Sequence, residues 1–221
     1  MQQPKKLFFL FLILLFIPPS LRAEPSLAQR VESRYQNTRT WQASFVQTTF
    51  VDILKQKIKK SGMILVKKPD QLRIEYTSAP NKTYITDGHK LWIYKKDSLT
   101  AQQFGKPKDI ISAEALSFMG GLKNLSQLFE TLPPLNEPKV FVSIQNKSLQ
   151  KIHLTPKDKN SAILKLTLGV DSRDLSIREA VIFNTSGNVT HYAFNNLIFD
   201  KDLADSEFAL PPSPKRNIIK Q

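Results

Sequence analysis

Four short apolar runs follow one another between Ser61 and Tyr94, and turn signals separate them. The runs read GMILV, LRIEY, KTYIT and KLWIY, and the segments between them, KKPD, TSAPN and DGH, each contain Pro or Gly together with Asp or Asn. Those residues supply the fixed or positive backbone φ that tight turns require, and Asp-Gly between two apolar runs is a strong hairpin signal. The stretch therefore predicts an antiparallel meander.

The second run indicates how such a sheet would be exposed. Leu72, Ile74 and Tyr76 fall on one face of an extended strand, because successive side chains point to opposite faces. Arg73 and Glu75 fall on the other face. Antiparallel sheets commonly bury one face and leave the other in water, so we expect one apolar face and one polar face.

Three motifs in this stretch resemble those of the LolA family of periplasmic lipoprotein carriers. They are V-K-K-P at residues 66–69, L-x-I-x-Y at 72–76 and D-G-x-x-L-W-x-Y at 87–94, in the family's order and spacing. A-S-F-x-Q at 43–47 matches the family pattern near its start, whereas Leu72 and Ile74 replace the usual Phe and Trp. The resemblance spans nearly the whole chain after residue 23. It implies a mainly β (α+β) fold, a half-open antiparallel β-barrel of about eleven strands with a helical lid over a hydrophobic cavity.

Residues 1–23 have the pattern of a secretory signal peptide. Basic Lys5 and Lys6 precede an apolar run of eleven residues at 7–17, two prolines end that run, and Ala23 offers a small residue for cleavage. A retained membrane anchor is the alternative, but eleven residues are too few for a helix to span about 30 Å of hydrocarbon. The sequence contains no cysteine, so it has neither a lipid-modified Cys nor a disulfide. We expect an exported chain with a single domain at 24–221.

Outside the meander, periodicity predicts both helices and strands. Ser26 begins a helix that runs to about Asn37, with Gln29 placed for a capping box. Residues 110–131 have helical periodicity, and Gly120-Gly121 divides them into helices at 110–119 and 122–131; the family places its lid helices here. Further strands are predicted at about 41–54, 99–104, 139–145, 149–155, 162–170, 175–184 and 187–199, and the basic tail 215–221 is predicted to be loose.

The sequence offers little for catalysis or metal binding. It lacks G-x-S-x-G, H-E-x-x-H, P-loop and G-x-G-x-x-G motifs. His89 lies in a turn beside Asp87, where an Asp that bonds its own backbone is far commoner than an acid–base pair. His153 and His191 fall within predicted strands, and neither has a spaced metal partner. We therefore expect no catalytic residue, no metal site and no cofactor.

The chain is strongly basic. It has 32 Lys and Arg against 19 Asp and Glu, a formal net charge of +13. Acidic residues are interleaved with the basic ones, and export is expected, so nucleic acid is not an expected partner. The densest basic segment is KQKIKK at 55–60, followed by Lys67 and Lys68. It is either a solvated hairpin or a docking surface for acidic partners or lipid phosphates.

Apolar residues of the meander and of the predicted lid are candidates for a lipid-binding cavity, although each could instead belong to an ordinary core. The candidates are Phe45, Leu72, Ile74, Tyr76, Trp92, Tyr94, Leu116, Met119, Leu122 and Phe129. In the family, the residue before the strand-turn proline is commonly Arg, which hydrogen-bonds lid backbone groups. Lys68 occupies that place here, so the resemblance makes Lys68 a lid latch with a flexible ammonium instead of a rigid fork.

The resemblance implies a monomeric periplasmic carrier that shields the acyl chains of outer-membrane lipoproteins. It would take them from an inner-membrane ABC-type lipoprotein-releasing transporter and hand them to an outer-membrane acceptor lipoprotein. Two alternatives stay open. One is a LolA-like carrier of another amphiphile such as a glycolipid, which the replacements at Leu72 and Ile74 allow. The other is a periplasmic hydrolase acting on lipid or sugar, for which the sequence shows no acid–base or Ser–His pair.

Overall fold

A computed structural model describes residues 24–107, 125–133, 143–213 and 215–221. Along the chain these residues form α1 (Leu27–Asn37), β1 (Thr40–Val51), the 3-10 helix η1 (Asp52–Leu54), β2 (Gln56–Lys67), β3 (Gln71–Tyr76), β4 (Lys82–Thr86), β5 (Leu91–Lys95), β6 (Thr100–Phe104), α3 (Leu125–Leu128), β7 (Phe129–Leu132), β8 (Gln150–Pro156), β9 (Ile163–Asp171), β10 (Ser176–Asn184), β11 (Val189–Phe199), the 3-10 helix η3 (Asp205–Phe208) and β12 (Asn217–Lys220).

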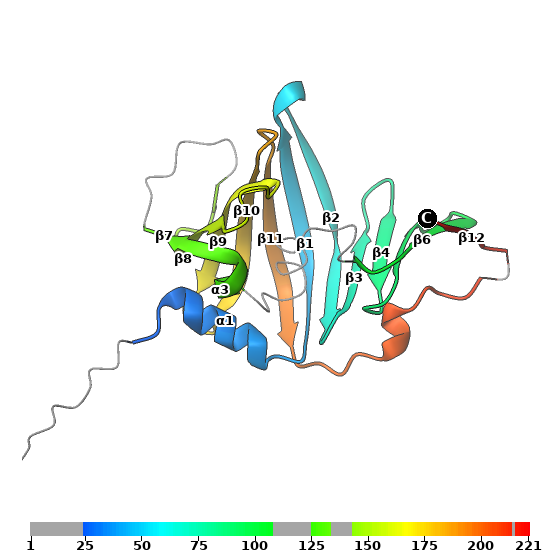
Figure 1. Ribbon diagram of the computed structural model, residues 1–221, viewed down its shortest axis with the longest axis horizontal. Coiled ribbons are helices and arrows are strands. Elements are labelled where there is room, and N and C mark those ends of the chain that lie inside the picture. Colours follow the sequence, from blue (N-terminus) through cyan, green and yellow to red (C-terminus); the bar gives the residue numbers. More distant parts are fainter. Residues whose placement is uncertain (1–23, 108–124, 134–142, 214) are drawn as a thin grey trace, which may run out of the picture.

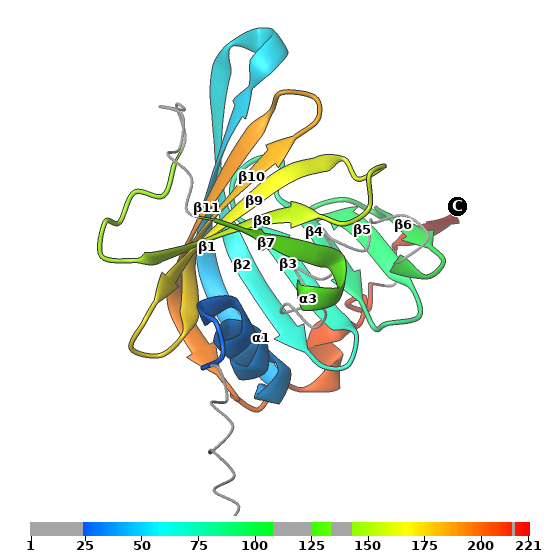
Figure 2. The same cartoon turned by 60° about the vertical axis from the view of Figure 1, so that its left-hand side comes forward.

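The strands form one twelve-stranded sheet in the order β12-β6-β5-β4-β3-β2-β1-β11-β10-β9-β8-β7. Neighbours pair antiparallel, except that β12 runs parallel to β6. Figures 1 and 2 show the sheet curving around α1 and α3 while its two edges stay apart. The mainly β, half-open architecture expected from the sequence is thereby confirmed, with twelve strands among the described residues.

Most predicted elements appear where the sequence placed them. The four apolar runs become part of β2, nearly all of β3, the whole of β4 and most of β5, paired in order. Helix α1 begins with the predicted capping box: the Gln29 backbone N–H donates to the Ser26 hydroxyl at 3.3 Å, and the Gln29 side chain accepts from the Ser26 N–H at 2.8 Å. The turn Asp87 accepts the backbone N–H groups of His89 and Lys90, both at 2.8 Å, as expected for a backbone-bonding aspartate.

Three predictions about the second half of the chain need correction. The predicted helix at 122–131 is helical only over α3 and then becomes β7, because the backbone of Phe129–Leu132 pairs with β8. The tail 215–221 is not loose, since β12 pairs with the otherwise open edge of β6. Residues 143–145 of the predicted strand 139–145 are not in a strand. The predicted helix at 110–119 and residues 139–142 lie outside the described part of the chain.

The largest apolar cluster fills the concave side of the sheet, where α1 packs. Val31 and Tyr35 of α1 are buried against residues from both halves of the sheet, including Trp41 of β1 and Phe194 of β11. Glu32 of α1, only 7% exposed, accepts hydrogen bonds from the backbone N–H and hydroxyl of Ser126 in α3 at 3.1 and 3.0 Å. The N-terminal helix is therefore fixed both to the sheet and to the start of α3.

Irregular segments and the short 3-10 helix η3 cover part of the convex side. Leu203 and Phe208 pack against Leu65 of β2. Leu65 points to the convex side, because its neighbours Ile64 and Val66 belong to the concave cluster. On the other half, Glu179 of β10 accepts the backbone N–H groups of Gln145 and Asn146 at 2.6 and 3.0 Å and also contacts His191 Nε2 at 2.8 Å. Both faces of the sheet are thus covered along much of their length.

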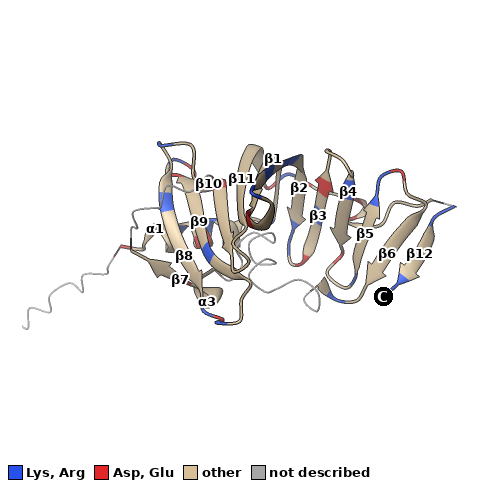
Figure 3. Cartoon of the chain, turned by 90° about the horizontal axis from the view of Figure 1, so that it is seen from above, with Lys and Arg blue, Asp and Glu red and all other residues tan. Residues whose placement is uncertain are grey.

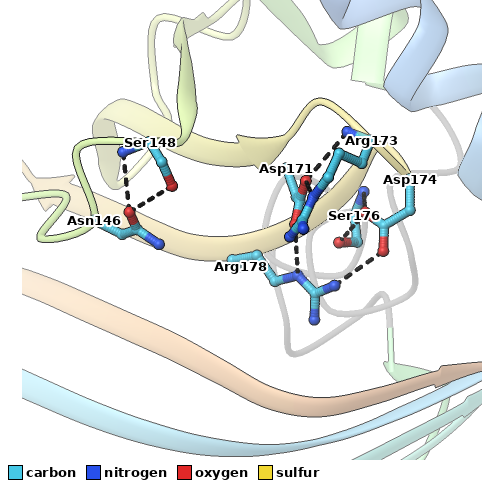
Figure 4. A network of polar contacts seen from close by, with 7 residues as sticks. All are labelled: Asn146, Ser148, Asp171, Arg173, Asp174, Ser176 and Arg178. Carbon is cyan, nitrogen blue, oxygen red and sulfur yellow. Dashed lines mark hydrogen bonds and ion pairs between the residues drawn. The ribbon is translucent and has the colours of Figure 1, made fainter.

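The β9–β10 turn is fixed by the charged network of Figure 4. The Asp171 carboxylate accepts from the Arg173 guanidinium at 2.9 and 2.7 Å, and Asp174 accepts from Arg178 at 2.9 Å. Side-chain hydrogen bonds from Arg173 hold the pKa of Asp171 well below its usual range. Directly after the turn, the Ile177 N–H donates to the phenol oxygen of Tyr35 at 3.0 Å. The network therefore positions the strand end to which α1 attaches.

The hairpin tip, residues 52–60, extends beyond its neighbours. Strand β11 pairs with β1 only as far as Phe50, and β3 pairs with β2 only from Gly62 onward. Figure 1 shows this tip as the cyan projection above the rest of the sheet.

Candidate functional site: an aromatic concave face

A continuous chain of aromatic rings crosses the concave face from α1 to β4. In order of contact, the rings are Phe199, Tyr35, Trp41, Phe194, Tyr192, Phe45, Tyr76 and Tyr84. Successive ring centroids are 5.4 to 6.5 Å apart, which is the range of edge-to-face and stacked pairs. Tyr192 and Phe194 are stacked, with 5° between their planes. The chain joins both halves of the sheet into one apolar surface.

Gly62 allows this chain of rings to cross β2. Phe45 on β1 and Tyr76 on β3 are separated by β2, yet their ring centroids are 5.4 Å apart. A Cβ at Gly62 would lie 2.7 Å from Cζ of Phe45 and 2.3 Å from the backbone oxygen of Glu75. The rings can meet only because position 62 has no side chain.

The concave face becomes polar toward the hairpin tip. The Tyr76 hydroxyl donates to Oε1 of Gln47 at 2.8 Å, and Nε2 of Gln47 donates to the Thr49 hydroxyl at 3.0 Å. The Thr49 and Thr190 hydroxyls are 3.1 Å apart. The Lys60 ammonium lies 5.5 Å from the Tyr76 ring centroid, within cation–π range. An amphiphile on this surface would meet rings beside α1 and hydroxyl, amide and ammonium groups farther out.

Two tyrosines at the boundary between these regions are held in the neutral form. Burial raises the pKa of Tyr192, and the nearby Tyr76 adds to the effect. Burial also raises the pKa of Tyr76, with a further contribution from Tyr84. Both hydroxyls therefore remain hydrogen-bond donors well above neutral pH, and neither is poised as a base.

The indole N–H of Trp41 is a hydrogen-bond donor buried inside the apolar cluster. The residue is 5% exposed, and within the described ranges no group accepts a hydrogen bond from its buried indole N–H. An unmade hydrogen bond at a buried donor costs about 1–3 kcal/mol. The indole N–H can therefore donate to a carbonyl or ether oxygen supplied by a ligand or by another part of the chain.

The structure separates the predicted cavity residues into three groups. Phe45, Leu72, Ile74, Tyr76 and Phe129 all belong to or pack against the concave cluster. Trp92 and Tyr94 do not: they pack on the convex side with Ile85, Ala101 and Leu210, so their assignment to the same cavity is corrected. Leu116, Met119 and Leu122 lie outside the described residues.

Lys68, the predicted latch, contacts α1. Its ammonium donates to the backbone oxygen of Tyr35 and, at 2.8 Å, to that of Gln36. Both carbonyls are in the last turn of the helix, where a cation is favourable. The contact with α1 gives Lys68 a role in holding the end of that helix. Its role as a lid latch stays a hypothesis, because the lid segment falls largely outside the described ranges.

Sequence reasoning missed the contribution of β11 to the site. Tyr192 and Phe194 are two residues apart in the run VTHYAF and so share a face, a signal that could have identified them. Among the described residues no group of three or more His, Asp or Glu is placed to hold a metal ion, and none of the described helices has the length and apolarity needed to cross a membrane.

These features define a class of protein: an open, curved sheet whose concave face carries a continuous chain of aromatic rings. The family model described as "Outer membrane lipoprotein carrier protein LolA" matches residues 36–211. The chain therefore belongs to the LolA family of outer-membrane lipoprotein carrier proteins.

Individual relatives agree with this membership. An outer-membrane lipoprotein carrier protein of Coxiella burnetii (strain RSA 331 / Henzerling II) is 26% identical over 205 residues, covering 90% of this chain and 89% of that protein. One from Alkalilimnicola ehrlichii is 24% identical over 225 residues, covering 97% and 96%. The crystal structure of an uncharacterized conserved protein from Thermus thermophilus shares the fold with a TM-score of 0.54 at 10% identity, covering 89% of this chain and all of that one.

Proposed function

We propose that this protein is a periplasmic carrier that holds the acyl chains of outer-membrane lipoproteins against its concave aromatic face. The observation that carries the proposal is the unbroken chain of rings from Phe199 to Tyr84. Exposing a ~15-carbon acyl chain to water costs roughly 12 kcal/mol, at about 0.8 kcal/mol per CH₂. A lipoprotein with several such chains needs an apolar surface of this kind to cross water.

The polarity gradient of the face sets the direction in which the cargo would lie. Acyl chains would lie against the half-buried rings of Tyr192, Tyr76 and Tyr84, and the ester or amide groups would meet the amide and hydroxyl groups of Gln47 and Thr49. This arrangement requires binding, exclusion of water and release, with no bond made or broken on the chain. The protein would act as a monomer without metal, cofactor or nucleic acid.

The transfer route that we propose is the one implied by the resemblance to the family. The carrier would receive lipoproteins from an inner-membrane ABC-type lipoprotein-releasing transporter and deliver them to an outer-membrane acceptor lipoprotein. Residues 1–23 would direct export and be removed, leaving 24–221 in the periplasm. Lys68 would favour the closed state of the lid as well as hold the end of α1.

The test is to recover the exported chain from the periplasm of a Gram-negative host and to identify bound molecules by mass spectrometry. We expect acylated lipoproteins in the wild type, a reduced amount in Tyr76→Ala, and an unchanged amount in Trp92→Ala, which alters the convex side. Absence of any acylated molecule from the wild type would overturn the proposal.

A second candidate has one observation in its favour. Leu72 and Ile74, where the family usually has Phe and Trp, leave aliphatic side chains beside the ring chain, and these could suit an amphiphile such as a glycolipid. Recovery of glycolipid in place of lipoprotein in the same experiment would select this candidate. Recovery of deacylated products would instead indicate a hydrolase.

A further inference from the structure

The hairpin tip exposes large aliphatic side chains at its apex. Ile53 is 87% exposed and Leu54 is 57% exposed, and Ile58 beside them is 42% exposed. All three lie within six residues of one another at the point where the sheet projects farthest, as Figure 1 shows. Apolar side chains clustered on a projection are typical of an interaction site.

The tip is held in this conformation by specific bonds. Its turn is η1, and Lys55 closes it in a left-handed conformation with φ 50° while donating its N–H to the Asp52 oxygen at 3.1 Å. The Asp52 N–H donates to Oδ1 of Asn188 at 2.9 Å, which braces the turn against the neighbouring β10–β11 turn. The aliphatic side chains therefore point into solvent from a fixed support, so a partner would not have to order them.

The end of the sheet that carries the hairpin tip has more basic than acidic residues. The described turns and strand ends there contain Lys55, Lys57, Lys59, Lys60, Lys82, Lys95, Lys96, Lys157, Lys159, Lys215 and Arg216 against Asp52, Asp97, Glu130 and Asp158. The turns and final segment of the opposite end carry both signs of charge: Asp70, Asp87, Asp171, Asp174, Asp200, Asp202, Asp205 and Glu207 lie there with Arg39, Lys67, Lys68, Lys90, Lys106, Lys147, Arg173 and Lys201. Figure 3 looks onto the tip-bearing end with basic residues in blue. The excess of basic over acidic residues at the tip-bearing end would turn the tip toward a negative surface.

We propose that the hairpin tip docks the protein on an anionic lipid bilayer, with Ile53 and Leu54 entering the acyl region and the surrounding lysines meeting lipid phosphates. Aliphatic side chains at the apex with ammonium groups behind them match the order of layers that a bilayer presents. An acidic protein surface would pair with the lysines but would leave the two apical aliphatic groups in water.

Docking at this point also orients the concave face. The polar part of that face, around Gln47 and Thr49, lies on β1 between the ring chain and the tip. A bilayer at the tip would therefore face the polar end of the concave surface and lie away from α1. The inference stands independently of the cargo, because it concerns an outer surface and not the ring chain.

The first experiment is vesicle co-sedimentation of the chain from Glu24 onward, free of cargo. This form is used because residues 7–17 would themselves bind lipid and because every described helix and strand begins after Ser26. We expect binding to phosphatidylglycerol/phosphatidylethanolamine vesicles, weaker binding to phosphatidylcholine vesicles, and weakening by salt. Ile53→Ser/Leu54→Ser should lower the partition coefficient about tenfold or more, and Lys57→Gln/Lys59→Gln should lower it about fivefold per lysine.

Matched controls are available at the other end of the sheet. Ile198 is 43% exposed on β11, and Lys201 is exposed just beyond that strand; Ile198→Ser and Lys201→Gln should leave binding unchanged. Circular dichroism and thermal melting of each variant separate loss of binding from loss of fold. Equal binding by the wild type and the Ile53→Ser/Leu54→Ser variant, or no binding by the wild type, overturns the proposal.

A second experiment locates the contact directly. Because the chain has no cysteine, Leu54→Cys and Ile198→Cys each provide one site for an environment-sensitive fluorophore. Anionic vesicles should shift the emission at position 54 to shorter wavelength and leave position 198 unchanged. A shift at both positions, or at neither, contradicts docking through the tip. Either result leaves the mass-spectrometric test of cargo binding unaffected, so failure of the two proposals can be distinguished.

Discussion

The Phe45 ring lies directly over Gly62, so that a methyl group at position 62 would come within 2.7 Å of the ring's Cζ. This contact joins β1 to β3 across the intervening strand and keeps the aromatic face continuous.

Gly62→Ala should therefore destabilise the protein. The added Cβ would also approach the Glu75 backbone oxygen, which cannot rotate away, so Phe45 or β3 must shift. Overpacking of this kind costs about 1–3 kcal/mol, and a lower denaturation midpoint in urea would report it. Gly187→Ala is not a suitable control because Gly187 has φ 79°; Gln102→Ala, at an exposed position on β6, is expected to be nearly neutral. A wild-type midpoint for Gly62→Ala would contradict the contact.

The two tryptophans should respond differently to an acylated ligand. Trp41 belongs to the concave cluster, whereas Trp92 packs on the convex side. Brominated acyl chains should quench tryptophan fluorescence in Trp92→Phe, which retains Trp41, and should have little effect in Trp41→Phe. Quenching confined to Trp92 would move the binding surface to the other side of the sheet.

Asp171 should make stability depend on pH. Arg173 lowers the pKa of Asp171 in the folded state, so the unfolded chain binds the proton more readily. The resulting stabilisation is complete above the unfolded value of about 3.9 and is lost as pH falls through the lower folded value. Asp171→Asn should thus lower Tm at pH 7, and its difference from the wild type should shrink in acid. The exposed Asp202→Asn serves as control, and a Tm difference that is independent of pH would contradict the ion pair.

Lys68 should stabilise the end of α1. Lys68→Leu removes a charged donor from the Tyr35 and Gln36 carbonyls, and we expect a loss of about 1 kcal/mol with faster hydrogen exchange in residues 27–37. Lys68→Arg should restore most of the protection. Exchange across 110–131 in the same proteins tests the latch hypothesis separately. Unchanged exchange in 27–37 would exclude the helix contact, and unchanged exchange in 110–131 would exclude the latch.

The meander was predictable because its turn residues and the alternation of apolar and polar side chains along its strands indicate the same strand boundaries. Pro69, Gly88 and the alternating run at β3 define register and face without help from the rest of the chain. Strand β5 shows the limit of this reasoning. In the run LWIYK, four successive residues are apolar, and both sides of the strand are covered in the fold, so periodicity could not show that Trp92 and Tyr94 point away from the concave face.

Residues 129–131 and 217–220 were mispredicted for a different reason. FETL can continue a helical stripe through Leu125 and Phe129, and only the free edge of β8 makes it a strand. Likewise the exposed, basic β12 is a strand because β6 offers unpaired backbone groups. Contacts between distant segments decide both cases, and local propensity does not report them.

The pairing of β1 with β11 has a consequence for how the molecule acquires its structure. It aligns Trp41 with Phe199, so the central seam joins the start of the chain to a segment near its end. The chain loses conformational entropy when it closes a loop of this length, and it does so before the stabilising contacts between the strands can form. Folds dominated by such non-local pairing therefore form slowly. The two halves of the sheet cannot be joined until β11 is available, so a chain whose later segments are not yet synthesised stays open along that seam.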